Sequence, residues 1–192
     1  MSEPLPGWYN DLEAFEANAW QQMTRGAADR RSAFHTPVVA STSTNGEPNA
    51  RTVVLRQCDP SNRTLRFHTD KRAGKVGEME ANKSLCVVFY DKGQKLQLRV
   101  RGRAELHDLQ TEVGMVAWDR TRPFSRECYR VAPSPGSLIE QGDGYASDPD
   151  VDGSDAFTAV IVHVETIEAL YLAAAGHRRA LFERETRRWM VP

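Results

Sequence analysis

The sequence predicts a mainly β protein with flanking helices, an α+β fold, in a single domain spanning residues 1–192. Three observations favour this class. Short runs rich in Val, Thr, Leu and aromatic residues alternate with turn clusters of Asn, Asp, Gly and Pro. Residues 10–30 instead carry their apolar side chains at helical spacing. The length of 192 residues with 40% hydrophobic content suits one domain with a substantial core.

Residues 1–35 are expected to form an N-terminal helical segment. Acidic residues come early in the 10–30 stretch and arginines come late, which suits the helix dipole. The apolar positions at helical spacing are Leu12, Phe15, Ala19, Trp20 and Met23. This amphipathic helix is expected to pack on the barrel or on a partner chain.

The first strands are expected to pair as hairpins. Residues 36–44 predict the first strand, and residues 44–47 (Thr-Asn-Gly-Glu) predict the turn into the second. The runs 50–56 and 65–69, separated by a turn cluster, predict another hairpin. Because strand side chains alternate, Arg51 and Arg56 cannot share one face of a regular strand, so a strand end or a bulge is expected between them.

The clearest two-residue period runs from Leu96 to Leu106, with apolar residues on one face and Gln97 and three arginines on the other. The apolar face is expected to line a barrel interior. Before it, residues 72–82 predict a short helix and residues 85–90 a buried strand. After it, residues 107–118 predict a helix.

The C-terminal part contains a long loop and closing strands. Residues 131–155 are rich in Pro, Gly and acidic residues and predict a loop that is either a site lid or disordered. Residues 157–164 and 167–172 predict two closing strands. His163 alternates opposite the core face and is interpreted as a surface histidine rather than a ligand.

Composition limits the partners of the chain. A net charge of −1 offers no global attraction for nucleic acid or an acidic membrane. No signal-like or membrane-spanning run is visible, so a cytoplasmic location is expected. The three cysteines lack close metal-type spacing and are interpreted as reduced thiols, with a redox role as the alternative.

A local basic cluster lies before the predicted short helix and in its first turn. It comprises Arg51, Arg56, Lys71, Arg72 and Lys75, with the hydroxyls of Thr52 and Thr69. Cations, hydroxyls and helix N-terminal amides together can hold a phosphate. The alternative is that these are ordinary solvated surface cations.

Four segments occur in a characteristic order: Arg-Thr-Val-Val-Leu-Arg at 51–56, Phe-His-Thr-Asp at 67–70, Lys75, and Leu-Gln-Leu at 96–98. Together they resemble the FMN-binding core of the pyridoxamine 5'-phosphate oxidase family, closest to the oxidase-related FMN-binding proteins rather than the authentic oxidases. The resemblance is strong over residues 36–106 and weaker to the C-terminus. It implies an FMN-binding split β-barrel and a homodimer with FMN at the subunit interface.

The resemblance also implies which residues meet FMN. Phosphate contacts are expected from Arg51, Arg56, Thr69 and Lys75, flavin-ring contacts from the backbone of Val53 and Val54, and a ring hydrogen bond from Gln97. The full implied set is Arg51, Thr52, Val53, Val54, Arg56, His68, Thr69, Lys75 and Gln97. No metal site is expected.

Substrate positions match the family less well. Trp118, Arg122, Ser125 and Arg178 fall near the positions that hold substrate in the true oxidases, with the serine spacing off by one. The alternative for the 120–126 segment is a solvated basic turn. Ala180 stands where the family has a histidine, and no catalytic acid or base is identifiable.

Three classes of function remain open from the sequence. The first is an FMN-dependent oxidoreductase acting on a small molecule. The second is a non-catalytic flavin-binding carrier or sensor, which the missing histidine favours. The third, RNA or haem binding, has little support, because aromatic residues make up only 8% of the chain and do not interleave with the basic strand.

Overall fold

The computed structural model describes residues 4–192, so the first three residues of the predicted N-terminal segment lie outside the described residues. The α-helices are α1 Leu12–Ala28, α2 Gly74–Ala81, α3 Glu112–Asp119 and α4 Pro123–Arg126. The strands are β1 Val38–Thr42, β2 Pro48–Thr52, β3 Leu55–Asp59, β4 Thr64–Asp70, β5 Ser84–Asp91, β6 Leu96–His107, β7 Phe157–Tyr171, β8 Arg178–Phe182 and β9 Arg187–Met190. Within residues 4–192, no helix is long and apolar enough to cross a bilayer.

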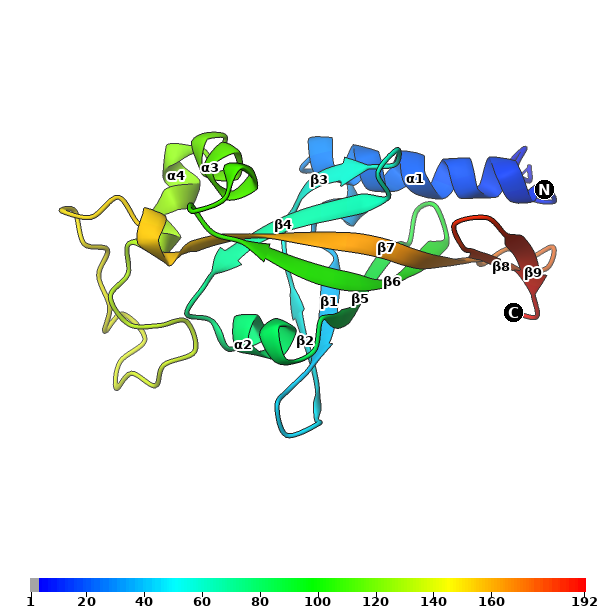
Figure 1. The fold of residues 1–192 in the computed structure, drawn as a ribbon. Coiled ribbons are helices and arrows are strands. Elements are labelled where there is room, and N and C mark those ends of the chain that lie inside the picture. The colour runs from blue at the N-terminus through cyan, green and yellow to red at the C-terminus, as the bar shows by residue number, and fades with distance from the viewer. Residues whose placement is uncertain (1–3) are drawn as a thin grey trace.

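The nine strands form one sheet in the order β2-β1-β5-β6-β7-β4-β3, with β8 joining β7 and β9 pairing with β8. Neighbouring strands are antiparallel, and the curled sheet does not close into a complete barrel. Helix α1 runs along one side of the sheet, α2 lies on the opposite side, and α3 and α4 sit at one end (Figure 1). The predicted mainly β architecture with flanking helices is confirmed.

Helix α1 begins at a side-chain cap. The carboxylate of Asp11 accepts a hydrogen bond from the backbone N–H of Ala14 at 3.0 Å, which satisfies one free amide of the first turn. Phe15, Ala19 and Met23 are fully buried at the predicted helical spacing. The N-terminal helix therefore covers the sheet with its apolar face.

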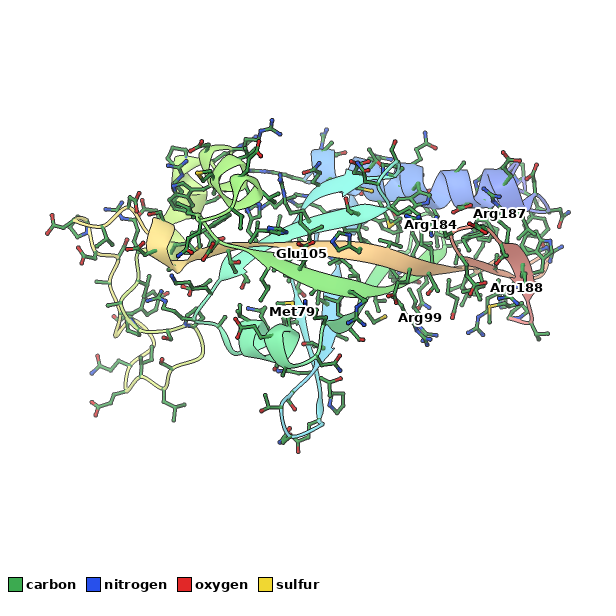
Figure 2. All side chains as sticks on the ribbon, in the orientation of Figure 1. Met79, Arg99, Glu105, Arg184, Arg187 and Arg188 are labelled. Carbon is green, nitrogen blue, oxygen red and sulfur yellow. The ribbon has the colours of Figure 1, made fainter. Side chains whose placement is uncertain are left out.

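The core follows the period-two pattern of β6. Leu96, Leu98 and Val100 are completely buried, whereas Gln97 on the opposite face is half-buried. Met79 points from α2 toward the sheet, and Glu105 lies on β6 (Figure 2). A smaller aromatic cluster under α3 packs Phe157 against Trp118, Tyr129 and His68.

Residues 50–56 are not one strand, which corrects the predicted hairpin. β2 ends at Thr52 and pairs with β1, whereas β3 begins at Leu55 and pairs with β4. A register shift follows between Leu55 and Gln57. The interruption expected between Arg51 and Arg56 therefore exists, because the two arginines belong to strands in different parts of the sheet.

The two predicted closing strands form a single strand, β7. The β6–β7 register shifts between Arg101 and Gly102, so Thr166 and Val164 pair with consecutive residues of β6. Strand β7 therefore contains one extra residue at a bulge and continues past it. The helix predicted over 107–118 begins only at Glu112, because His107 still belongs to β6. Strands β8 and β9 were not predicted.

The long loop is largely irregular. Residues 131–155 contain one isolated bridge, between Val131 and Ser147, and the start of a 3₁₀ turn at Ser154–Ala156. Most of its residues are exposed. A loop was correctly predicted here.

Candidate functional site

Two separate groups of cations can be distinguished among the predicted site residues. The first surrounds Lys75, in the first turn of α2. The Lys75 ammonium donates to the Thr69 hydroxyl, at the end of β4, with an Nζ–Oγ1 distance of 3.1 Å. Burial and then the nearby charge of Arg51 lower the pKa of Lys75. A half-buried ammonium beside a second cation and a hydroxyl is suited to receive an anion.

Arg51 is held in place by a short network. Its guanidinium donates to Ser41 Oγ at 2.5 Å and to Glu78 Oε2 at 2.9 Å, and Asn49 donates to Glu78 Oε1 at 2.7 Å. Burial alone raises the pKa of Glu78, but the hydrogen bonds from Ser41, Asn49 and Arg51 outweigh it and lower that pKa. The carboxylate therefore stays charged and fixes the arginine near the α2 N-terminus.

The other residues expected near FMN lie in several places. Thr52 is exposed at the end of β2, and Val53 and Val54 are half-buried in the break before β3. The backbone N–H of Val53 already donates to the Pro37 carbonyl oxygen at 3.0 Å. Gln97 lies on β6 on the face opposite the core.

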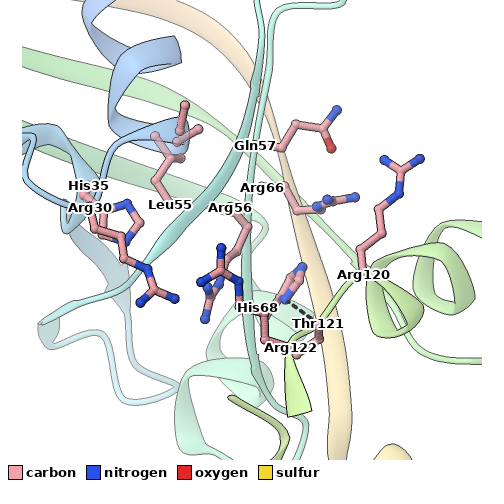
Figure 3. Close-up of a pocket in the computed structure, with 12 residues that line it drawn as sticks. Arg30, His35, Leu55, Arg56, Gln57, Arg66, His68, Arg120, Thr121 and Arg122 are labelled. Atoms are coloured by element: carbon pink, nitrogen blue, oxygen red, sulfur yellow. Dashed lines mark hydrogen bonds between the residues drawn. The ribbon is translucent and has the colours of Figure 1, made fainter. Parts of the chain in front are cut away.

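Arg56 and His68 belong to the second group, which lines a cavity of about 440 Å³ (Figure 3). We call this cavity the arginine pocket. Its cationic side chains are Arg30, Arg56, Arg66, Arg120 and Arg122, and its other lining residues are Ala27, Ala28, His35, Leu55, Gln57, His68 and Thr121. No Asp or Glu lines it. The side chains come from the end of α1, the β3–β4 hairpin and the segment after α3.

The polar groups at the centre of the pocket lack partners. Among residues 4–192, neither Arg66 Nε nor His68 Nε2 has a hydrogen-bond partner, although both atoms are buried. His68 Nδ1 lies 3.4 Å from the Thr121 hydroxyl. Burial, followed by the charges of Arg66 and Arg56, lowers the pKa of His68 to about 3. The imidazole is therefore neutral at physiological pH and can hydrogen-bond to a ligand.

The four positions expected near substrate are dispersed. Arg122 lines the pocket, whereas Trp118 is buried in the aromatic cluster with Arg126 stacked over it at 4.4 Å. Ser125 lies half-buried in α4 and does not line the pocket. Within this chain, Arg178 stacks over the Tyr9 ring at 4.0 Å instead of joining Arg122.

Sequence reasoning missed Arg30, Arg66 and Arg120. A signal existed for one of them, because Arg66 and His68 alternate on the same face of a predicted strand. Arg120 lies in the 120–126 segment compared with the substrate positions of the oxidases, although it was not itself chosen, and no comparable signal existed for Arg30.

Comparison with known proteins identifies the relatives of this chain. Residues 17–108 match the model of the "Pyridoxamine 5'-phosphate oxidase, FMN-binding domain" family. The pyridoxine/pyridoxamine 5'-phosphate oxidase 2 of Arabidopsis thaliana is 33% identical over 129 residues, which cover 62% of this chain. The matched part spans only 64% of that relative's length.

Two solved structures share the fold over nearly the whole chain. A pyridoxamine 5'-phosphate oxidase-related, FMN-binding protein from Nostoc punctiforme aligns with a TM-score of 0.73 at 18% identity, covering 99% of this chain and 100% of that one. PhzG from Burkholderia lata, solved with tetrahydrophenazine-1-carboxylic acid, aligns with a TM-score of 0.69 at 16% identity, covering 100% and 99%. These likenesses confirm the FMN-binding split-barrel fold.

The cofactor group fits the residues that this structure provides. Lys75, Thr69 and Arg51 supply two cations and a hydroxyl beside the first turn of α2, which is the donor set that a phosphate monoester requires. The matched segment contains all of these residues. Residues 17–108, which carry these donors, are thus similar to the FMN-binding domain of the pyridoxamine 5'-phosphate oxidase family.

Proposed function

We propose that this protein is an FMN-dependent oxidoreductase that acts on a small anionic molecule. The observation that carries the proposal is the pairing of Lys75 with Thr69 beside Arg51, inside the segment that matches an FMN-binding domain. An ammonium is partly desolvated there and faces a second cation. A bound phosphate would stabilise both charges.

Each residue has a physical role in this proposal. Arg51, held by Glu78, orients the phosphate of FMN, while Lys75 and Thr69 contribute a charge and a hydroxyl. Gln97 and the Val53–Val54 backbone would fix the flavin ring. When bound, FMN supplies the capacity to accept or donate a hydride, and the protein's part is to position it and exclude competing reactions.

The arginine pocket is the proposed place for the anionic substrate. Arg56 and Arg122 line it together, and Arg56 follows the Val53–Val54 break directly. In this proposal Arg178 would act only from a second copy of the chain, because within one chain it contacts Tyr9 and Asn10. A homodimer with FMN at the interface is therefore part of the proposal. The proposal also includes a single domain and a cytoplasmic location. It includes no binding of nucleic acid or membranes.

A second candidate is a flavin-binding carrier or sensor without turnover. It is favoured by Ala180, which stands where the family has a histidine. Ala180 is completely buried in β8, between Ala169 and Trp189 of the neighbouring strands. That position therefore offers neither a proton donor nor access to a ligand.

The first experiment is an absorption spectrum of the purified protein, with the released cofactor identified by mass. We expect FMN at about one per chain, and a colourless protein that takes up no added FMN would refute the proposal. Anaerobic bleaching by a nicotinamide cofactor or by pyridoxamine 5'-phosphate would favour the enzyme. A flavin that neither reagent reduces would favour the carrier.

A matched pair of variants tests the phosphate site. Lys75→Met removes the half-buried ammonium, whereas Lys71→Met removes an exposed one just before α2. We expect Lys75→Met to lower FMN affinity at least tenfold and Lys71→Met to leave it nearly unchanged. Equal affinities in both variants would show that Lys75 does not hold the cofactor.

A further inference from the structure

The arginine pocket differs from the rest of the molecule in having no counter-charge. Elsewhere, several half-buried guanidinium groups are paired with acids: Arg51 with Glu78, Arg63 with Glu16, and Arg99 and Arg179 with Glu168. In the pocket, none of the five arginine side chains makes a hydrogen bond or an ion pair within residues 4–192. Nearly equal totals of 25 basic and 26 acidic residues make this local excess notable.

The five arginines fall into two groups on either side of His68 (Figure 3). Arg30, Arg56 and Arg122 gather on one side, and Arg66 and Arg120 lie on the other. The electrostatics agree with this placement. Burial and then the charge of Arg120 lower the pKa of Arg66. Burial and then the charges of Arg66 and Arg56 lower the pKa of His68, which lies between the two groups.

The dimensions of the pocket favour a small molecule over a macromolecule. Its volume of about 440 Å³ is within the range of ligand pockets. A nucleic acid would need a basic surface extending along its backbone, whereas this chain has a net charge of −1 and this cavity is lined by five arginines without an acid. Arg66 and His68 both line this cavity, and each has a buried nitrogen, Nε and Nε2 respectively, without a hydrogen-bond partner within residues 4–192.

We propose that the arginine pocket binds a small molecule carrying two anionic groups, phosphate or carboxylate. One group lies at Arg30, Arg56 and Arg122, the other lies at Arg66 and Arg120, and His68 donates or accepts a hydrogen bond between them. This inference deepens the proposed function by naming the substrate class of the same site. Arg66 and Arg120 form the second anion subsite.

Calorimetric titration of the protein, as purified and with its FMN content measured, tests the inference. The probes are inorganic phosphate and glycerol 3-phosphate, with one anionic group each, and 3-phosphoglycerate and fructose 1,6-bisphosphate, with two. We expect at least one two-anion probe to bind tenfold or more tighter than both one-anion probes. Affinities that do not depend on the number of anionic groups would overturn the inference.

Variants locate the second anion. Arg120→Met changes an exposed residue and should fold normally, and Arg103→Met is its control, an exposed arginine on β6 with no ion pair in residues 4–192. We expect Arg120→Met to remove most of the preference for two anions while leaving phosphate affinity within about twofold. Arg103→Met should change neither quantity, and equal behaviour of the two variants would refute the second subsite.

The two proposals fail in different ways. A protein that takes up no FMN but still shows an Arg120-dependent preference for two-anion probes would refute the proposed function and support the pocket. A protein with one FMN per chain and no such preference would refute the pocket alone.

Discussion

Glu78 is expected to stabilise the fold by holding Arg51, and replacing it by glutamine tests this directly. The carboxylate accepts hydrogen bonds from Arg51, Ser41 and Asn49, and its side chain is only 8% exposed. Glu78→Gln keeps the shape but removes the charge and presents an N–H₂ group toward donors. Part of the network is then left unsatisfied.

The magnitude follows from the geometry. A hydrogen bond to a charged group contributes about 1.5–3 kcal/mol, and breaking a fully buried pair costs about 3–5 kcal/mol. Because the Arg51 side chain is 19% exposed and can regain some water contact, we expect the lower range. The predicted loss in the free energy of unfolding is about 2–3 kcal/mol, which in a chain of this size lowers Tm by roughly 4–12 °C.

The pH dependence has a definite sign. The pKa of Glu78 is lowered on folding from its ordinary value of 4.5, so its contribution is complete above that pH. It is lost as pH falls from about 4.5 through the lower pKa of the folded state. The stability difference between wild type and Glu78→Gln should therefore be full at pH 7 and should shrink in acid.

Urea unfolding at pH 7 and at pH 3–4 measures both quantities. Glu80→Gln, an exposed change on the same helix, is the control and should alter stability by less than about 0.5 kcal/mol. The reasoning is refuted if Glu78→Gln is no more destabilising than Glu80→Gln. It is also refuted if the Glu78→Gln difference stays constant with pH.

Three further outcomes are expected. Gly102→Ala should destabilise the protein by about 2 kcal/mol or more in thermal unfolding, because its Cβ would lie 2.2 Å from the carbonyl oxygen of His163; a neutral effect would contradict the packing. Burial raises the pKa of both the Cys58 thiol, to about 11, and the Cys128 thiol, but only Cys128 is exposed, so iodoacetamide at pH 8 should label Cys128 before Cys58, as read by peptide mass. Arg66→Met should raise the Tm of protein free of small anions, since an unpaired and partly desolvated guanidinium is removed; a lowered Tm would show that Arg66 is satisfied.

Local patterns were sufficient to predict several elements. The alternation from Leu96 to Leu106 specifies β6 because its two faces differ in burial, and the spacing of Phe15, Ala19 and Met23 specifies α1. The division of residues 50–56 between two strands depends instead on which partners they pair with. Residues up to Thr52 pair with β1, which lies before this segment, and residues from Leu55 pair with β4, which lies after it. The point of division therefore depends on the pairing in the complete sheet.

The phosphate-site residues could be proposed from sequence because they are close along the chain. Thr69 and Lys75 are separated by one turn at the start of α2, and their contact is a local one. Arg51 lies on the β1–β2 hairpin, which the pairing of β1 with β5 places in the sheet, and its network with Glu78 was not predicted. The resemblance to a family supplied what spacing alone could not.

The arginine pocket shows why charge counts along a sequence do not reveal a binding site. The near-neutral composition hides the pocket, because several arginines elsewhere pair with acids distant in sequence, as in the Arg63–Glu16 contact. Arg30, Arg66 and Arg120 meet only after α1, β4 and the α3 end are assembled, and they meet without an acid. Clustered unpaired cations repel one another and therefore lower the stability of the ligand-free protein. This cost is consistent with the proposal above, in which a bound ligand supplies the negative charge that the cavity lacks.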